Sequence, residues 1–399
     1  MKKVFLTVFK KNPNETESLN GLRALSIIGV IIQHIWLVVV LNKIPRYHIF
    51  DNLFMNFTVF VDLFFVLSGF LIYGGLSNFY KEHGFIDYKG FFVKRIFRIF
   101  PAYYFFLFII LFLGMMQIRL LNSKPNLNFT EMLVLQALKE ASLKYDFLYL
   151  SNYFGGSVSH NWSLATEEQF YIFLPFFLGF FLLKTKQETR IKSLIIIYFL
   201  PLVFRMLHFL LASDAVSESN FIYRAAHTRM DSLFIGILVF EFHSVYRDKF
   251  EEIMRYRKYL YGSLIILFFP VFLITHADLP FFADTVKYSL ANFFFGIVLL
   301  LCLDGQSVFS RAFSFSVFRP VARVSYTAYL WHISVGGAVL GPVSSSGNSF
   351  FWFRFSFQVI STVFITLCVG WLLFILVEYP FIRIREKYFS GKDLKSNSA

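Results

Sequence analysis

The chain has 399 residues, 57% of them hydrophobic, and a formal net charge of +13. Its apolar residues fall in repeated runs of about twenty, which excludes an ordinary soluble domain and is typical of a polytopic membrane protein. The basic residues gather between these runs, so we interpret the charge as membrane topology and expect no nucleic-acid partner. The two cysteines, Cys302 and Cys368, both lie in apolar runs, which predicts neither a disulfide framework nor a metal site.

The expected fold is an all-α polytopic membrane protein with about ten transmembrane helices. The predicted spans are 22–41, 54–77, 96–116, 164–183, 193–212, 230–243, 260–275, 285–303, 323–343 and 352–377. With a cytoplasmic N-terminus, the inner segments hold about 26 Lys and Arg and the outer segments about 10, as the positive-inside rule requires. Both termini are therefore expected in the cytoplasm, and a bacterial inner membrane suits this topology.

Residues 1–385 are expected to form a single transmembrane domain. Residues 386–399 are polar and are expected to be a disordered cytoplasmic tail. The N-terminal segment has too short an apolar stretch for a cleaved signal peptide.

Ionisable side chains inside the spans cost roughly 2.5–3.5 kcal/mol each at mid-helix, so each needs a reason. Arg23 and His34 lie in the first span, eleven residues apart. That spacing puts them on one stripe of a helix, separated by about 16 Å along its axis. Asp62 lies in the second span and His332 in the ninth. Taken alone, each is as consistent with a structural hydrogen bond or ion pair as with catalysis.

Other polar residues lie at the ends of spans. Arg95 and Arg98 are three residues apart at the cytoplasmic start of the third span, where an arginine pair either anchors a helix end or binds phosphates. Glu167 and Glu168 lie at the outer start of the fourth span. Glu378 ends the tenth span on the cytoplasmic side, where an ion pair with an arginine is the plainer explanation.

The second span also holds Ser68 and Gly69, which favour a close approach of a neighbouring backbone. Sorted by depth, the arginines lie at the inner mouth and Glu167 near the outer mouth. The residues expected near the middle are His34, Asp62 and His332. This order suits an enzyme that joins a cytosolic, phosphate-bearing donor to an acceptor, and it suits a proton-coupled transporter equally.

Six motifs occur in a fixed order along the chain. They are the R-x10-H pair of Arg23 and His34, "FVDLFFVLSGF", "RIFR", "SLATEEQFY", "YLWH" and "EYP". Together they resemble the membrane-bound acyltransferase-3 family over about residues 18–385. One departure is "FVD", where a glycine often precedes the valine. Some members carry a C-terminal SGNH-type domain outside the membrane; we expect none here, so the membrane domain would transfer the group itself or pass it to a partner.

The resemblance implies an enzyme that moves an acyl group, most often acetyl, from acyl-CoA to a hydroxyl of a surface carbohydrate or its lipid-linked precursor. His34 would be the principal catalytic residue, either as general base or as acyl acceptor. Asp62 would orient an imidazole or a guanidinium, and Glu167 would lie on the acceptor side.

The same resemblance assigns the phosphates of the acyl-CoA donor, with no metal, to Arg23, Arg95 and Arg98. The remaining candidates for the site are Ser68, Glu168, His332 and Glu378. Membrane lipid is expected as the surroundings. The acceptor stays open among lipopolysaccharide O-antigen sugars, capsule or exopolysaccharide, peptidoglycan, a glycolipid and a small secreted metabolite.

Two other functions are compatible with the residues. The first is a proton-coupled exporter of a sugar-lipid or small molecule, with His34 and Asp62 as a relay. The second is a structural membrane partner in envelope assembly, in which neither His34 nor Arg98 would matter.

Overall fold

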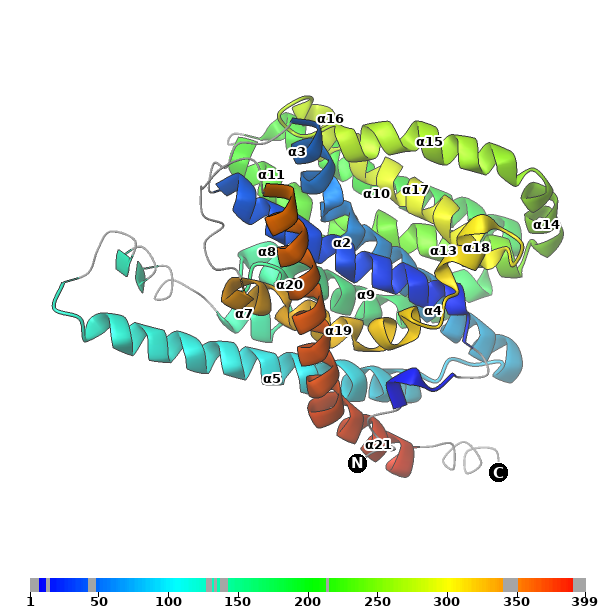
Figure 1. Ribbon diagram of the computed structural model, residues 1–399. Helices are drawn as coiled ribbons and strands as arrows, with labels where there is room; N and C mark the ends of the chain where they lie inside the picture. Colours follow the sequence, from blue (N-terminus) through cyan, green and yellow to red (C-terminus); the bar gives the residue numbers. More distant parts are fainter. Residues whose placement is uncertain are drawn as a thin grey trace. The chain divides into compact units, whose positions relative to one another are not determined.

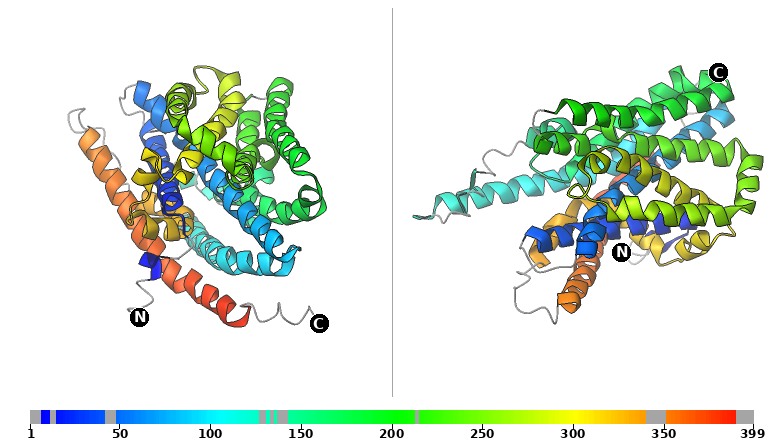
Figure 2. Two further views of the ribbon diagram at one scale, coloured as in Figure 1. Left: turned by 90° about the vertical axis from the view of Figure 1, so that its right-hand side faces the viewer. Right: turned by 90° about the horizontal axis from the view of Figure 1, so that it is seen from above.

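The computed structural model describes residues 7–11, 15–41, 48–126, 131–132, 135–136, 143–212, 215–339 and 351–389. Within these ranges the chain consists of helices and turns, with no strand. Figure 1 shows the helices in chain order, and Figure 2 shows them from two further sides. The all-α prediction is therefore confirmed for the described residues.

The chain forms two compact units. Unit 1 comprises residues Met1–Ile86, Phe173–Tyr223 and His227–Trp371, and unit 2 comprises Asp87–Ile172, Arg224–Ala226 and Leu372–Ala399.

Unit 1 holds most of the helices. They are η1 (Thr7–Phe9), α2 (Glu17–Leu41), α3 (His48–Met55), η2 (Asn56–Val59), α4 (Phe60–His83), η3 (Leu182–Lys184), α10 (Gln187–Leu211), α11 (Ala215–Arg224), α12 (Ala226–Arg229), α13 (Asp231–Ser244), α14 (Arg247–Arg255), α15 (Arg257–Leu273), α16 (Pro280–Asp284), α17 (Val286–Leu303), α18 (Val308–Phe313), α19 (Phe318–Val339) and α20 (Phe351–Leu373).

Unit 2 is built on α5 (Tyr88–Asn122), a 35-residue helix. Its other elements are α7 (Leu143–Phe147), α8 (Ser151–Phe154), the first part of α9 (Asn161–Phe180), the π-helical turn η5 (Phe374–Glu378) and α21 (Tyr379–Tyr388). The first three residues of the tail expected at 386–399 are therefore helical, because α21 extends to Tyr388. Residues 390–399 lie outside the described residues.

Each of the ten expected spans overlaps a helix of the described chain. Within the part of the chain that the structure describes, seven helical stretches are long and apolar enough to cross a membrane, and the pair α14–α15, bent by 77°, supplies an eighth candidate. α13 has only 14 residues. The chain is therefore a multi-pass membrane protein, while the count of ten spans and the side of the termini stay predictions.

The centre of unit 1 is the crossing of α4 and α13. A Cβ atom added to Gly69 would lie 2.0 Å from the carbonyl oxygen of Leu233, and one added to Gly236 would lie 2.1 Å from that of Val66. Only glycine lets two helix backbones come this close. Of the close approach predicted at Ser68 and Gly69, the part at Gly69 is confirmed.

Unit 2 owes its local shape to a turn that packs against the first half of α5. Tyr103 donates a hydrogen bond to the carbonyl oxygen of Asp146, at 2.8 Å, and Tyr104 donates one to that of Phe147, at 3.1 Å. The carboxylate of Asp146 accepts from the backbone N–H of Ser157 and the amide of Asn161. These bonds fix where α9 begins along α5.

Candidate active site

Two histidines meet where α2 packs against α19 in unit 1. The ring centroids of His34 and His332 are 4.8 Å apart, with the rings at 73° to each other. His332 is buried, with 2% of its surface exposed, and His34 is half-buried. Residues almost 300 positions apart in the sequence are thus brought together in one site.

The hydrogen bonds of this pair assign its protons. Nδ1 of His332 lies 2.5 Å from the carbonyl oxygen of Tyr329, which can only accept, so this nitrogen carries the proton and Nε2 of the neutral ring is an acceptor. Nδ1 of His34 lies 2.9 Å from the carbonyl oxygen of Val30 and 3.4 Å from Nε2 of His332. Two acceptors therefore face Nδ1 of His34, which leaves the lone pair on its Nε2.

Nε2 of His34 has no hydrogen-bond partner among the described residues. A neutral imidazole with a fixed Nδ1 proton and an available Nε2 can take a proton from a hydroxyl or attack a carbonyl carbon. In either case the ring becomes positively charged, and the two acceptors that face its Nδ1, Nε2 of His332 and the carbonyl oxygen of Val30, stabilise that charge.

Arg23 lies on the same continuous helix, α2, as His34. The helix is unbroken over its 25 residues, so the offset of about 16 Å expected between the two residues holds along its axis. Arg23 is half-buried.

Asp62 is paired with an arginine that the sequence analysis did not single out. Nη2 of Arg229 donates to both carboxylate oxygens of Asp62, at 2.7 and 2.6 Å, and neither side chain is exposed. The rings of Tyr223 and Tyr288 flank the same guanidinium, with centroids 5.1 and 4.0 Å from its Cζ. Of the two partners expected for Asp62, the structure shows the guanidinium.

A second buried pair lies next to the first. Arg205, a basic residue inside a predicted span, donates to Asp231 at 2.8 Å and to Ser289 at 2.6 Å. Lys287, also buried, donates to Asn56 at 2.9 Å. The partners in these clusters come from α4, α10, α12, α13 and α17 and from η2, so no sequence spacing could have joined them.

In unit 2, Arg95 and Glu167 share one tyrosine. Cζ of Arg95 lies 4.9 Å above the ring of Tyr171, whose hydroxyl donates to Glu167. Arg95 also interacts electrostatically with Glu167 and Glu168. The expected separation of Arg95 and Glu167 between opposite mouths is therefore wrong.

The cause of this error lies in the turn before α9. α7 and Tyr149 pack beside the first half of α5, and Phe106 contacts His160, so α9 starts level with the middle of α5 rather than its far end. Burial raises the pKa of the Asp146 carboxyl, although hydrogen bonds from Asn161 and Ser157 act in the opposite direction. Six residues into α9, Glu167 then reaches the level of Arg95.

The remaining predicted residues fall into different surroundings. Arg98 is exposed, and its positive charge acts electrostatically on the buried Glu378. Glu168 is buried and Ser68 half-buried.

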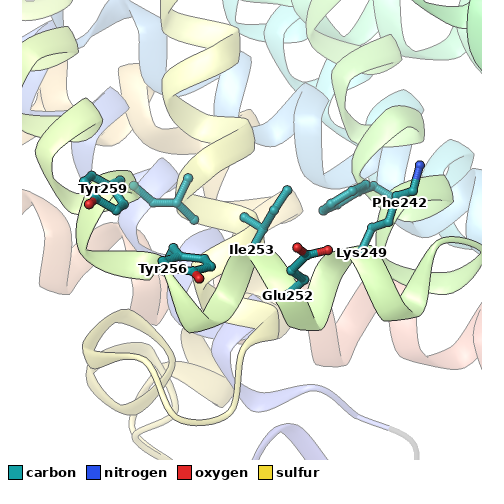
Figure 3. A pocket seen from close by; sticks show the side chains of 7 residues that line it. Phe242, Lys249, Glu252, Ile253, Tyr256 and Tyr259 are labelled. Carbon is teal, nitrogen blue, oxygen red and sulfur yellow. The ribbon is translucent and has the colours of Figure 1, made fainter.

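One surface pocket lies at the corner between α14 and α15, with a volume of about 360 Å³. Figure 3 shows Lys249 and Glu252 toward one end of it and the two tyrosines, Tyr256 and Tyr259, at the other. None of the predicted site residues lines this pocket. Among the described residues, no group of three or more His, Cys, Asp or Glu could hold a metal ion.

Comparison with known proteins identifies the family. The model of the acyltransferase-3 family, described as an acyltransferase domain, matches residues 16–375. The chain belongs to the acyltransferase-3 family. The match covers the whole of α2, α4 and α19, and with them both histidines of the pair. Membership confirms the predicted enzyme class, an acyltransferase.

Two relatives come from Staphylococcus aureus. SACOL0978 of strain COL, assigned by name as an O-acetyltransferase, is 28% identical over 324 residues, which is 79% of this chain and 50% of that protein. O-acetyltransferase OatA of strain NCTC 8325 is 25% identical over 348 residues, 81% of this chain and 51% of OatA. The chain spans about half the length of the curated relatives it matches. No solved structure matches it.

Proposed function

We propose that this acyltransferase-3 member is a membrane O-acyltransferase that moves an acyl group, acetyl above all, from cytosolic acyl-CoA to a hydroxyl of a cell-surface carbohydrate or its lipid-linked precursor. Its family and its relatives named as O-acetyltransferases support the reaction type. A bacterial inner (plasma) membrane is the proposed location.

The observation that carries the proposal is the available Nε2 of His34. As general base, Nε2 takes the proton of the acceptor hydroxyl while the hydroxyl oxygen attacks the thioester carbonyl carbon. The C–S bond then breaks, and the CoA sulfur takes up a proton, so that CoA leaves as the thiol. As acyl acceptor, Nε2 attacks the thioester first, CoA leaves, and the hydroxyl then removes the acyl group from the ring. Both routes need the tautomer that His332 and Val30 favour.

The donor phosphates are proposed to bind arginines. Arg23 lies at the start of α2, about 16 Å along the axis from His34, a distance that suits the long pantetheine arm of CoA. In unit 2, Arg95 is held over Tyr171 and Arg98 is exposed. Guanidinium groups bind phosphates through paired hydrogen bonds, which favours these residues over lysines for the task.

The contacts of Asp62 disfavour the exporter alternative. A relay residue must take up and release a proton, whereas both oxygens of Asp62 accept from Arg229 and the pair is fully buried. Asp62 is therefore assigned to holding Arg229 rather than to a relay.

The test uses membrane vesicles that contain this protein, supplied with acetyl-CoA labelled on the acetyl group and with the native envelope fraction as acceptor. CoA release and label in the glycan or glycolipid fraction are followed for the wild type and for His34→Ala. We expect transfer by the wild type only. An Arg98→Ala arm should raise the apparent KM for acetyl-CoA more than it lowers kcat, because it removes phosphate binding.

Transfer by His34→Ala at the wild-type rate would remove His34 from the mechanism. A wild-type protein that consumes neither acetyl-CoA nor other acyl-CoAs, while a sugar-lipid moves across the vesicle membrane, would establish the exporter instead.

A further inference from the structure

An aromatic cluster lies at the end of α2 beyond His34. Trp36, two residues after His34, is completely buried. Its ring centroid lies 4.7 Å from that of Phe54 and 5.0 Å from that of Phe355. Two residues add about 3 Å along a helix and turn it by about 200°. Along the axis the cluster therefore begins just beyond His34, away from Arg23, while Trp36 projects from nearly the opposite face of α2 to His34.

Trp352 is the tryptophan of this cluster whose ring is partly exposed. It is 37% exposed, although its ring packs against Phe50 at 4.5 Å, edge to face. It also lies nearly parallel to Trp36, at 6.1 Å and 19°, and contacts Phe351 at 5.2 Å. Neighbours on several sides thus fix the orientation of a ring that still offers surface to a ligand.

Acidic and amide side chains accompany the cluster on α3 and the turn after α15. The indole of Trp36 donates to Asp51 at 3.1 Å. The amide of Asn52 donates to the carbonyl oxygen of Leu273 at 2.7 Å and to Asp278 at 3.1 Å. Asp51 and Asn52 are half-buried and Asp278 is exposed. Carboxylate and amide oxygens are acceptors for hydroxyl groups.

We propose that Trp352, with Asp51 and Asn52 on α3, forms a carbohydrate-binding site for the acceptor. The inference rests on the proposed function and adds the residues that bind its carbohydrate acceptor. A pyranose ring has a face of C–H groups and a rim of hydroxyls. The flat indole matches the face, and the oxygens of α3 match the rim, as in binding sites that combine aromatic walls with a few placed polar groups.

The position of the site is consistent with this role. Arg23 lies toward the N-terminal end of α2 and Trp36 toward its C-terminal end, with His34 between them and close to Trp36. Along the axis of α2, the donor site at Arg23 and the sugar site beside Trp36 therefore lie on opposite sides of His34. The placement keeps the phosphate-binding and sugar-binding groups apart.

The competing explanation is an aromatic belt at the membrane surface, where tryptophans anchor helices among lipid headgroups. Phe353 provides a matched control, because it is the next residue on α20, is 72% exposed, and has no ring contact among the described residues. A belt role gives neither Trp352 nor Phe353 a part in binding a soluble sugar, whereas a sugar site uses Trp352 and not Phe353.

The experiment measures binding of two probes, a β-1,4-linked N-acetylglucosamine tetrasaccharide and maltotetraose, to the full chain in nanodiscs by titration calorimetry without donor. We expect saturable binding of at least one probe to the wild type. Trp352→Ala should weaken that binding at least tenfold, Trp352→Phe about twofold to threefold, and Phe353→Ala less than twofold. Thermal unfolding of each variant in the same nanodiscs confirms that it is folded.

Two results would overturn the site: no binding of either probe to the wild type, or equal effects of Trp352→Ala and Phe353→Ala. The acetyl-transfer assay separates this from the proposed function. Sugar binding through Trp352 without acetyl transfer would leave the site standing and defeat the proposed function. Acetyl transfer by Trp352→Ala at the wild-type rate would defeat the acceptor site and leave the proposed function standing.

Discussion

At the scale of single residues, the state of His34 depends on two acceptors of different origin. The carbonyl oxygen of Val30 is four residues back on the same helix, so the helix itself supplies it. Nε2 of His332 comes from α19, and only the packing of α2 against α19 supplies it. A ring held on one side by its own helix and on the other by a second histidine keeps one tautomer and one orientation.

His332 is therefore expected to act as a positioning residue. His332→Leu removes the acceptor beside Nδ1 of His34 and should lower kcat by about tenfold to a hundredfold, a part of what general base catalysis contributes. The KM for acetyl-CoA should change less than threefold. His332→Gln, whose side-chain oxygen can accept, should keep more activity than His332→Leu. Steady-state kinetics of both variants in vesicles test this.

Equal activity of the Leu and Gln variants would contradict the positioning role, since a purely space-filling histidine does not distinguish them. A shift of the pH profile of kcat in His332→Leu but not in His332→Gln would support it further.

At the scale of helices, the crossing of α4 and α13 shows how closely two backbones pack. Gly69 faces the carbonyl oxygen of Leu233, and Gly236 faces that of Val66, so each helix presents a glycine to the backbone of the other. The Asp62–Arg229 pair joins the same part of the unit, because α13 follows Arg229 directly. The crossing thus sets the position of α4 against the segment that carries the arginine.

Gly69→Ala should destabilise the protein, since its Cβ would lie 2.0 Å from a backbone oxygen that cannot rotate away. We expect a loss of about 1–3 kcal/mol in the free energy of unfolding, typical of overpacking. Gly75→Ala on the same helix is the control, because nothing lies within 4 Å of its added Cβ. It should be neutral or stabilising by up to about 1 kcal/mol.

Thermal unfolding in detergent, followed by circular dichroism, compares the two alanine variants. Equal unfolding midpoints would contradict the tight crossing, because they would mean that the gap between α4 and α13 at Gly69 has room for a methyl group.

At the scale of the molecule, unit 1 is notable for charges that are buried in pairs. Asp62 pairs with Arg229, and Asp231 with Arg205, with no exposure of any of the four side chains. An isolated charge in such a place would be costly, so each partner depends on the other. These pairs link helices that are far apart in the sequence, and they explain why ionisable residues survive among apolar spans.

A double-mutant cycle tests this dependence. Asp62→Asn and Arg229→Gln should each cost about 3–5 kcal/mol, because each leaves an uncompensated buried charge. The double variant should be more stable than either single variant, and it should retain acetyl transfer if the pair only supports the fold. Unfolding midpoints and the vesicle assay give the two readouts.

If the two losses simply add in the double variant, the ion pair is not what joins these residues. If the double variant is stable yet inactive, Asp62 has the catalytic role that the motif resemblance implied.

The sequence by itself determined the class of fold, the position of the helices and the family. Long apolar runs can only form helices in a membrane, since each backbone N–H and C=O must be paired within the segment. Each of the ten predicted spans therefore overlaps a helix. Motif order along the chain was also sufficient for the family, and spacing alone placed Arg23 and His34 on one helix.

Only the tertiary structure decided which polar residues meet. The partners Arg229, Tyr171 and Trp352 could not be found from spacing, because a period of 3.6 residues relates neighbours on one helix and says nothing of the next. The depth of Glu167 was mispredicted for the same reason: spacing counts residues along the chain, whereas the packing of α7 against α5 sets the level at which α9 begins. Contacts between distant segments arise from packing, and packing is a property of the whole unit.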